Sequence, residues 1–298
     1  MKNISKTFGN VQALKGVSLD LYAGEVLALM GENGAGKSTL MNILSGSLQP
    51  TEGEIYLNGE KVVVPDPITA KKLGIAKIHQ ELQIVPELSV AENIFLGRWK
   101  TSAGPAVDFK AMKDEAKVYL DMLDVHVDPS KKLKDLRIGE QQLVEIAKAI
   151  SLNSKIIVMD EPTSAISEKE AEKLFTIIRR LRGEGKGIIY ITHRMEEIFK
   201  IADRLTVMRD GQYIGTVKAA ETSKDEIIRM MVGRDMSEQY PKDPTEKGEV
   251  ALEVKNLTYT PSMGSFRRSL KNISLKVRHG EVLGIAGLAG AGRSEFFE

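Results

Sequence analysis

A glycine-rich loop that occurs twice is the feature that most constrains the fold. Residues 31–38 read "GENGAGKS" and residues 287–294 read "GLAGAGRS". The segments that begin at Leu14 and Leu270 align without a gap over about 25 positions, and about half of these positions are identical. "MKNISKTF" and "EVKNLTYT" correspond as well. The two copies are about 256 residues apart, which is the length of a whole domain rather than of a solenoid repeat.

The repeat predicts where the domains begin and end. We expect residues 1–236 to be one complete copy and residues 251–298 to be the truncated start of a second copy. Residues 237–250 are polar and contain two prolines, so we interpret them as a linker. We expect the chain to be a fragment of a tandem protein, in which so short a second copy does not close its own core.

Four short apolar runs in the first copy are typical of buried strands: "EVLALMG", "GIAKIHQ", "KIIVMDEP" and "GIIYITH". Residues 108–124 and 140–152 lie between them and have the apolar spacing of helices. This alternation predicts an α/β fold with a parallel core. "VMRDGQYIGTV" carries Asp-Gly between two strand-like runs and predicts a hairpin.

Composition excludes several classes of function. The net charge of +1 gives no electrostatic case for nucleic acid as the main partner. The chain has no cysteine, so disulfides and thiolate metal sites are impossible. It has no apolar run near the roughly 20 residues that span a bilayer. We therefore expect any membrane role to come through a partner.

The first loop has the pattern G-x4-G-K-[ST] between a predicted strand and a predicted helix, which indicates a phosphate-binding loop rather than an ordinary glycine turn. Glycines allow backbone N–H groups to converge on phosphate oxygens, and the following helix directs its positive end at the same anion. Lys37 can reach the β- and γ-phosphates, and the Ser38 hydroxyl can ligate Mg²⁺. The predicted ATP-binding residues of this loop are Gly31, Glu32, Asn33, Gly34, Ala35, Gly36, Lys37, Ser38 and Thr39.

Polar residues follow three other predicted strands. Asp160 and Glu161 end the run "IIVMDE", where we expect Asp160 to hold Mg²⁺ and Glu161 to act as general base on water. Gln80 and His193 each follow a further strand, although alone either residue is an ordinary polar side chain. Because ligands of open parallel sheets lie at the carboxyl ends of the strands, we interpret all of these as one site.

These motifs together resemble those of the ABC-transporter ATPases. The loop "GENGAGKST", Gln80, "LRIGEQQ", "VMDEPTSAI" and "ITHRMEEI" follow in the order and spacing of that family, over essentially the whole chain. "AENIFLGR", "EQQLVEIAKAIS" and "MMVGRDM" are similar to the tandem ATPase subunit of bacterial monosaccharide importers of the ribose/galactose/xylose type. The resemblance implies a P-loop NTPase of ABC type, with a mixed sheet that has a parallel core, a small antiparallel β subdomain and an inserted helical subdomain at about 88–152.

The resemblance also implies roles for single residues, with ATP and Mg²⁺ as cofactors. Phe8 would stack on adenine, although a core aromatic is the alternative interpretation. Gln80 would sense Mg²⁺, which Ser38 and Asp160 would also bind. His193 would contact the γ-phosphate and serve catalysis together with Glu161.

The chain departs from the family pattern at two places. The signature loop, usually L-S-x-G-Q, here has Arg137, Ile138, Gly139 and Glu140 after its leucine. The second phosphate loop is degenerate, with Arg293 in place of lysine among Gly287, Gly290, Gly292 and Ser294. In this family each ATP lies between the phosphate loop of one domain and the signature of the other. Both departures therefore fall in one composite site, and we expect the Lys37 site to be the hydrolytic one. We expect the present chain to bind MgATP but to hydrolyse it weakly.

The predicted function is ATP hydrolysis that powers monosaccharide import. The implied partners are membrane permease subunits, a periplasmic sugar-binding protein and the missing second nucleotide-binding domain, with no nucleic acid. The implied location is peripheral, on the cytoplasmic face of the bacterial inner membrane. The alternatives are a soluble tandem ABC ATPase that acts on ribosomes, a DNA-repair or chromosome-organising ATPase and a non-enzymatic regulator.

Overall fold

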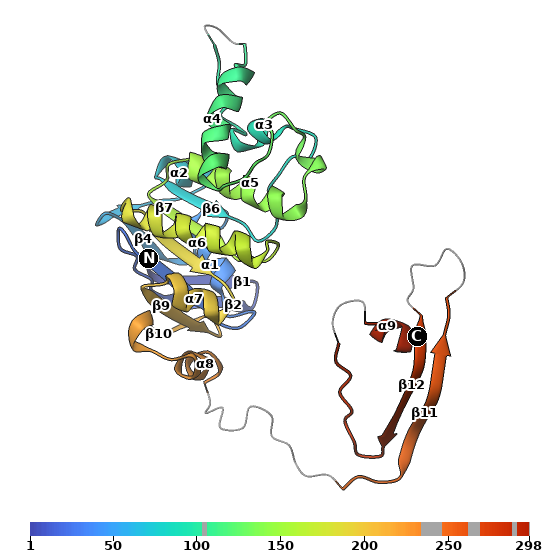
Figure 1. The fold of residues 1–298 in the computed structure, drawn as a ribbon. Helices are drawn as coiled ribbons and strands as arrows, with labels where there is room; N and C mark the ends of the chain where they lie inside the picture. The colour runs from blue at the N-terminus through green and yellow to red at the C-terminus, as the bar shows by residue number, and fades with distance from the viewer. Residues whose placement is uncertain (103–105, 234–245, 262–268, 288–290, 298) are drawn as a thin grey trace. The chain divides into compact units, whose positions relative to one another are not determined.

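The computed structural model describes residues 1–102, 106–233, 246–261, 269–287 and 291–297 (Figure 1). The chain divides into two compact units, residues 1–236 and residues 237–298, and each is described by itself. Among the described residues, no helix has the length and the apolar character needed to span a bilayer.

A six-stranded mixed sheet forms the centre of the first unit, in the order β10-β9-β3-β8-β7-β6. Adjacent strands from β9 to β6 pair in parallel, and only β10 at the edge is antiparallel. Every residue of β3 and β8 is buried, as expected for strands covered on both faces. The strands are β3 (Val26–Met30), β6 (Ile75–Ile78), β7 (Ile156–Asp160), β8 (Gly187–Ile191), β9 (Arg204–Arg209) and β10 (Gln212–Lys218).

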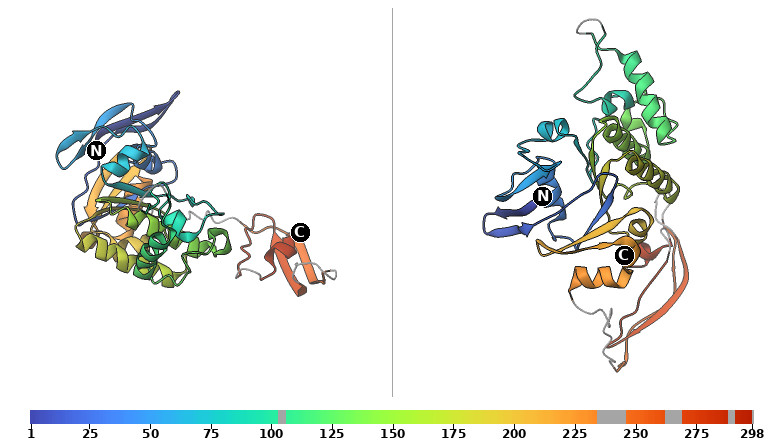
Figure 2. Two further views of the ribbon diagram at one scale, coloured as in Figure 1. Left: turned by 90° about the horizontal axis from the view of Figure 1, so that it is seen from above. Right: turned by 90° about the vertical axis from the view of Figure 1, so that its left-hand side faces the viewer.

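A second, antiparallel sheet has the order β2-β1-β4-β5. Its strands are β1 (Lys2–Phe8), β2 (Val11–Val17), β4 (Glu52–Leu57) and β5 (Glu60–Val62). Helix α1 (Lys37–Leu44) lies between the two sheets, because its apolar face packs with Ile4 and Ile55 on one side and with Leu29 and Ile189 on the other. Figure 2 shows this blue sheet on one side of the first unit and the green helices on the other.

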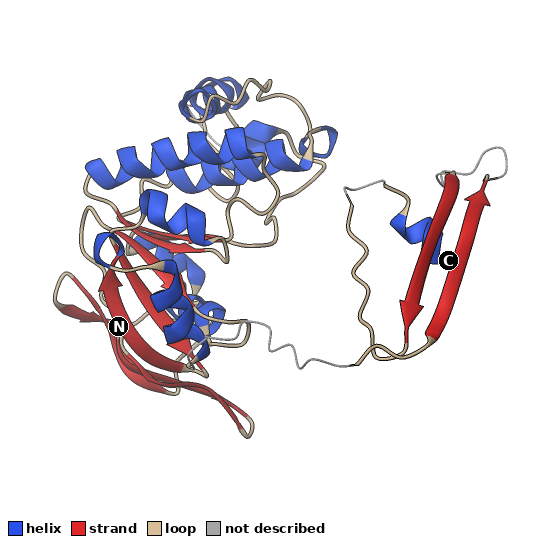
Figure 3. Cartoon of the chain, turned by 60° about the horizontal axis from the view of Figure 1, so that its bottom comes forward, coloured by secondary structure: helices blue, strands red, loops and turns tan. Residues whose placement is uncertain are grey.

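The other face of the mixed sheet is covered by helices, which Figure 3 shows gathered beside the strands. Helix α6 and the region around α3, α4 and α5 share one core with β7 and β8, whereas α7 and α8 pack with β3 and β9. The helices of the first unit are α1, α2 (Pro67–Lys72), α3 (Val90–Ile94), α4 (Phe109–Met122), α5 (Ile138–Ser151), α6 (Glu168–Gly183), α7 (Met195–Ile201) and α8 (Lys224–Val232), with short 3₁₀ turns at Leu133–Asp135 and Ala219–Glu221.

The first unit agrees with the predicted elements. The four apolar runs form β3, β6, β7 and β8, and the Asp-Gly hairpin joins β9 to β10. Helices α4 and α5 lie where helical spacing predicted them, although α5 begins two residues before residue 140.

The described residues of the second unit form β11 (Val250–Tyr259), β12 (Leu270–Arg278) and α9 (Arg293–Phe297). β11 and β12 form an antiparallel ribbon, and β11 begins at the last residue of the predicted linker. Residues 281–287, which repeat the β3 sequence, form no strand, and the side chain of Val282 is 98% exposed, whereas its counterpart Val26 is fully buried. In the first unit β3 lies between β8 and β9, and the described part of the second unit contains no counterpart of either strand.

Candidate functional site

Residues 31–36 connect β3 to α1 in a conformation that requires glycine. Gly34 has φ 87° and Gly36 has φ 96°, both in the left-handed region. A Cβ atom at Gly36 would lie 2.7 Å from the Leu14 side chain and 2.9 Å from the Ala13 carbonyl oxygen. The loop therefore packs closely against β2, and a side chain at Gly36 would displace either the loop or β2.

The N-terminus of α1 is free to receive an anion. Gly36 is its N-cap, no side chain caps the helix, and no acidic residue lies in its first turn. Lys37 Nζ donates to the carbonyl oxygens of Gly31, at 2.7 Å, and Glu32, at 2.9 Å. Burial lowers the pKa of Lys37, while Asp160 and Glu161 oppose that change. A partly desolvated ammonium group held across the loop is well suited to bind phosphate.

Asp160 ends β7 and is buried, with 6% of its surface exposed. Its desolvation raises the pKa of this carboxyl group, and the charge of Lys77 lowers it in part. Lys77 Nζ lies 3.9 Å from Oδ2 of Asp160 and donates to Oδ1 of Asn42, at 2.6 Å. Lys77 comes from the adjacent strand β6, and no motif in the sequence marks it as a site residue.

Glu161, Gln80 and His193 meet at the carboxyl end of the sheet. Oε1 of Glu161 lies 3.2 Å from Nδ1 of His193, and Nε2 of Gln80 lies 3.5 Å from Oε2 of Glu161. The backbone of Glu161 has φ 48°, a conformation that costs about 1–2 kcal/mol for a residue with a Cβ. Its N–H donates to the Ile191 carbonyl oxygen at 2.9 Å. The structure thus brings these three predicted site residues together, with Glu161 in a strained conformation of the kind found at functional sites.

A buried carboxylate next to this cluster was not predicted. Glu197 of α7 accepts hydrogen bonds from the hydroxyl groups of Thr163, at 2.8 Å, Tyr190, at 2.8 Å, and Thr192, at 3.0 Å. Thr163 belongs to the loop of Glu161, and Thr192 directly precedes His193. Glu197 therefore joins the two loops that carry Glu161 and His193. No sequence signal identified it, because its partners come from three separate segments.

Phe8 lies at the exposed end of β1, with 46% of its surface exposed, so it is not a core aromatic. Lys6 Nζ lies 5.1 Å from the centre of its ring. From Phe8 the chain turns into β2, which leads to Leu14 beside the phosphate loop. Stacking of Phe8 on adenine stays a prediction.

The signature residues lie at the start of α5, where Arg137 is the N-cap. The N–H of Arg137 donates to Oε2 of Glu140 at 2.9 Å. Arg137 and Ile138 are exposed, and a Cβ at Gly139 would lie 3.4 Å from the Ala165 carbonyl oxygen. Glu140 thus brings negative charge to a helix N-terminus that a phosphate would approach, which disfavours an anion there.

The second glycine loop retains part of the geometry of the first. Gly292 has φ 89°, and a Cβ atom at this position would lie 2.7 Å from the Leu270 side chain. A Cβ atom at Gly36 would lie at the same distance from the Leu14 side chain. Arg293 and Ser294 begin α9, and Gly287 is the first residue of the loop. Gly290 lies outside the described residues. Arg293 therefore stands at the position of Lys37 at the start of the helix.

The first loop and its neighbours fit a magnesium nucleotide. Mg²⁺ in such sites takes one or two carboxylates, together with phosphate oxygens and water. Asp160, the hydroxyl of Ser38 and the amide oxygen of Gln80 offer that donor set. Among the described residues, no cluster of three or more His, Asp or Glu side chains forms an all-protein metal site. These donors would thus leave positions around Mg²⁺ for the phosphate oxygens of a nucleotide.

Comparisons with known proteins agree with this geometry. Residues 14–164, just over half of the chain, match the family described as ABC transporter. Ribose import ATP-binding protein RbsA of Caldanaerobacter subterraneus subsp. tengcongensis is 50% identical over 295 residues, which are 99% of this chain and 58% of that protein. RbsA of Clostridium tetani is 50% identical over 296 residues, 99% of this chain and 57% of that protein. The chain thus spans a little over half the length of these relatives.

Solved structures give the same result for the fold. The ADP conformation of an ATP-binding cassette of an ABC transporter matches with a TM-score of 0.67 and 29% identity, over 78% of this chain and 97% of that one. A dimeric post-hydrolysis ATP-binding cassette bound to ADP and Pi matches with a TM-score of 0.65 and 30% identity, over 73% of this chain and 97% of that one. With the phosphate loop and the strand-end carboxylates in place, the chain belongs to the ABC transporter family.

Proposed function

We propose that this chain is part of an ATP-binding subunit that hydrolyses ATP to drive monosaccharide import through a membrane permease. The observation that carries the proposal is the convergence of Gln80, Glu161 and His193 beside Asp160, at the sheet edge that also carries the Lys37 loop. The relatives named above are import proteins, which favours transport over a soluble ATPase that acts on ribosomes or nucleic acid.

The residues of the first unit divide the work of hydrolysis. The loop from Gly31 to Thr39 binds the phosphates, Lys37 neutralises their charge, and Phe8 stacks on the base. Glu161 accepts a proton from the attacking water, and His193 contacts the γ-phosphate and orients the Glu161 carboxylate. When bound, Mg²⁺ supplies positive charge at the β- and γ-phosphates, held by Ser38, Asp160 and Gln80.

The two composite sites of the complete subunit differ in activity. Arg137 with Glu140 and the Arg293 loop occupy the same site, which binds nucleotide without efficient hydrolysis. Glu140 supports this assignment, because its carboxylate lies at the helix N-terminus that would face a phosphate. The Lys37 site pairs with a signature outside residues 1–298 and is the hydrolytic one.

The proposed partners are the permease subunits, a periplasmic sugar-binding protein and a complete second nucleotide-binding domain. The subunit is peripheral, on the cytoplasmic face of the bacterial inner membrane. We divide the chain into a first nucleotide-binding domain at 1–236, with its helical subdomain at about 88–152, a linker at 237–250 and the start of a second domain at 251–298.

ATP turnover of the permease complex in vesicles tests this function, measured with and without a sugar-loaded binding protein. We expect sugar to stimulate turnover and radiolabelled sugar to enter the lumen. Stimulation by ribosomes or RNA, with no response to sugar, would contradict the proposal.

A further inference from the structure

The turn between β9 and β10 packs against the strand that supports the phosphate loop. Gln212 pairs with Arg209, so Asp210 and Gly211 are the two residues of this turn. Both have left-handed backbone angles, with φ 50° at Asp210 and 75° at Gly211. The N–H of Lys15 donates to the Gly211 carbonyl oxygen at 2.8 Å. The turn is therefore joined to β2, although the two segments are far apart in the sequence.

The contact between Gly211 and β2 leaves no room for a side chain. A Cβ atom at Gly211 would lie 2.5 Å from the carbonyl oxygen of Ala13 and 3.0 Å from its carbonyl carbon. Both are backbone atoms, so no change of side-chain rotamer could relieve the contact. A methyl group at Gly211 would therefore displace β2 or force the turn away from it.

The same carbonyl group of β2 lies next to the end of the phosphate loop. A Cβ atom at Gly36 would lie 2.9 Å from the Ala13 carbonyl oxygen and 2.7 Å from the Leu14 side chain. Gly36 is the N-cap of α1 and directly precedes Lys37. Ala13 thus has Gly211 and Gly36 as close neighbours, and a shift of Ala13 would be felt at the start of α1.

The start of the phosphate loop contacts β9 directly. A Cβ atom at Gly31 would lie 2.4 Å from the Met208 carbonyl oxygen. The segment from Met208 to Gly211 therefore contacts one end of the loop itself and supports the other end, at Gly36, through Ala13. Because the loop N–H groups must converge on the phosphate oxygens, a small shift of one end against the other would weaken binding.

We propose that Gly211 is a positioning residue for ATP binding, which sets the conformation of the phosphate loop through Ala13 of β2. The inference rests on the proposed function, because ATP is the ligand that we assign to this loop. Gly211 acts by the close approach that its missing Cβ permits, and its role goes beyond that of an ordinary hairpin glycine.

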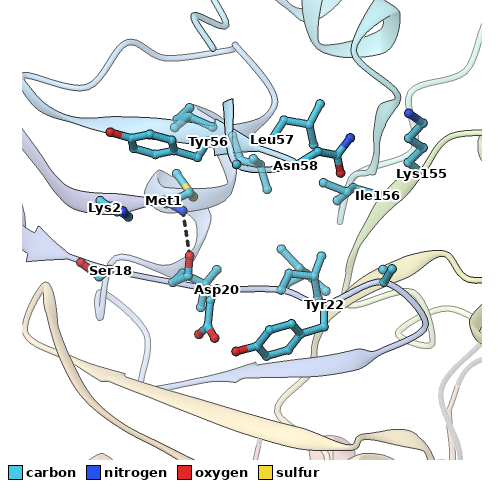
Figure 4. Close-up of a pocket in the computed structure, with 18 of the residues that line it drawn as sticks. Met1, Lys2, Ser18, Asp20, Tyr22, Tyr56, Leu57, Asn58, Lys155 and Ile156 are labelled. Atoms are coloured by element: carbon cyan, nitrogen blue, oxygen red, sulfur yellow. Dashed lines mark hydrogen bonds between the residues drawn. The ribbon is translucent and has the colours of Figure 1, made fainter. Parts of the chain in front are cut away.

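The turn between β4 and β5 offers a matched control. Leu57 pairs with Glu60, so Asn58 and Gly59 form a two-residue turn of the same kind, with φ 53° and 86°. A Cβ atom at Gly59 would meet no atom of the described residues within 4 Å, apart from its chain neighbours. Figure 4 shows Asn58 next to Leu57, at a pocket that Gly59 also lines. Alanine at Gly59 thus brings the backbone strain of Gly211→Ala without its contact.

The test compares Gly211→Ala with Gly59→Ala in the full chain, by thermal unfolding and by calorimetric titration with ATP. We expect strain to lower the Tm of Gly59→Ala by about 2–8 °C, and the Tm of Gly211→Ala to fall at least as far. ATP should bind about 10- to 100-fold more weakly to Gly211→Ala, because the displaced loop loses hydrogen bonds to the phosphates. The affinity of Gly59→Ala should equal that of the unaltered chain.

Asparagine variants separate the position of the loop from general stability. Asparagine adopts left-handed angles more readily than alanine but carries the same Cβ atom. We expect Gly211→Asn to regain part of the Tm and none of the ATP affinity, relative to Gly211→Ala. The amide NMR signals of Gly34 and Gly36, recorded without nucleotide, should shift in both Gly211 variants and stay in place in Gly59→Ala and Gly59→Asn.

Three results would overturn the proposal. The first is unshifted Gly34 and Gly36 signals in the Gly211 variants, and the second is equal ATP affinity of Gly211→Ala and Gly59→Ala. The third is an affinity that recovers together with the Tm in Gly211→Asn, which would show that lost stability alone weakens binding. Shifted signals in the Gly211 variants, with no ATP binding by the unaltered chain, would support the positioning of the loop and contradict the proposed function.

Discussion

Nδ1 of His193 lies 3.2 Å from Oε1 of Glu161, although 31 residues separate them in the chain. This contact joins the ends of β7 and β8, the neighbouring strands that precede the two residues. It holds the carboxylate that we assign as general base beside the imidazole that we assign to the γ-phosphate.

Replacing Glu161 with glutamine removes the proton acceptor and keeps the size of the side chain. We expect Glu161→Gln to reduce ATP turnover of the permease complex about 10²- to 10⁴-fold, with nucleotide affinity retained. Turnover is measured by phosphate release, and Glu184→Gln, at an exposed position, is the control. Turnover of Glu161→Gln near that of the control would contradict its role as base.

Lys37 can be tested against the arginine found in the second loop. We expect Lys37→Gln to weaken ATP binding about 10- to 100-fold, because it removes the charge next to the phosphates. Lys37→Arg keeps the charge but not the compact geometry, so binding should stay within about tenfold while hydrolysis falls. Calorimetric titration with ATP measures the binding of the two variants, and phosphate release measures their hydrolysis. Equal loss of binding in the two variants would show that charge at this position is not what matters.

Lys77 supports the buried Asp160 carboxylate in the absence of Mg²⁺. We expect Lys77→Met to lower the free energy of unfolding by about 1–3 kcal/mol, because a buried charge loses its partner. Added Mg²⁺ and nucleotide should restore part of this loss, and so should a second change, Asp160→Asn. Thermal unfolding of the single and double variants measures the coupling. Additive effects would show that the two side chains do not interact.

Glu197 joins the loops of Glu161 and His193 through three hydroxyl donors. We expect Glu197→Gln to lower the free energy of unfolding by about 1–3 kcal/mol. The NH₂ group of glutamine is itself a donor, so some of the hydroxyl groups that donate to the carboxylate would lose their acceptor. ATP turnover should fall with it, while Glu196→Gln, at the exposed neighbouring position, changes neither. Denaturant unfolding and phosphate release give the two readouts. A Glu197→Gln variant as stable as the control would remove this role.

Glu145 gives a pH dependence of stability that can be separated from catalysis. Burial raises the pKa of Glu145, and Lys148, whose Nζ lies 3.2 Å from Oε2 of Glu145, opposes that change. The folded chain then binds this proton more tightly than the unfolded chain does. The contribution to stability is therefore complete below about pH 4.5 and is lost as the pH rises through the raised value. Denaturant titrations at several pH values across this range give the free energy of unfolding at each pH. This free energy should change less steeply with pH in Glu145→Gln than in the unaltered chain, and an equal change with pH would contradict the assignment.

Much of the fold and the site could be predicted from the sequence, because both depend on local patterns. The buried strands are short apolar runs, and Gly36 and Lys37 act within one loop. The contacts of Lys77 with Asp160 and of Glu197 with Thr163 could not be predicted, since they depend on how separate segments pack. Residues 281–287 repeat the sequence of β3 but form no strand, because β3 is held in the first unit by β8 and β9, which come later in the chain.

The most direct test of the account is a crystal structure of the chain with Mg²⁺ and a non-hydrolysable ATP analogue. We expect the γ-phosphate within hydrogen-bonding distance of Lys37 and His193, the metal ion at Ser38 and Asp160, and the base against Phe8. A nucleotide bound elsewhere, or bound at the loop with Asp160, Glu161 and His193 directed away from it, would contradict the account.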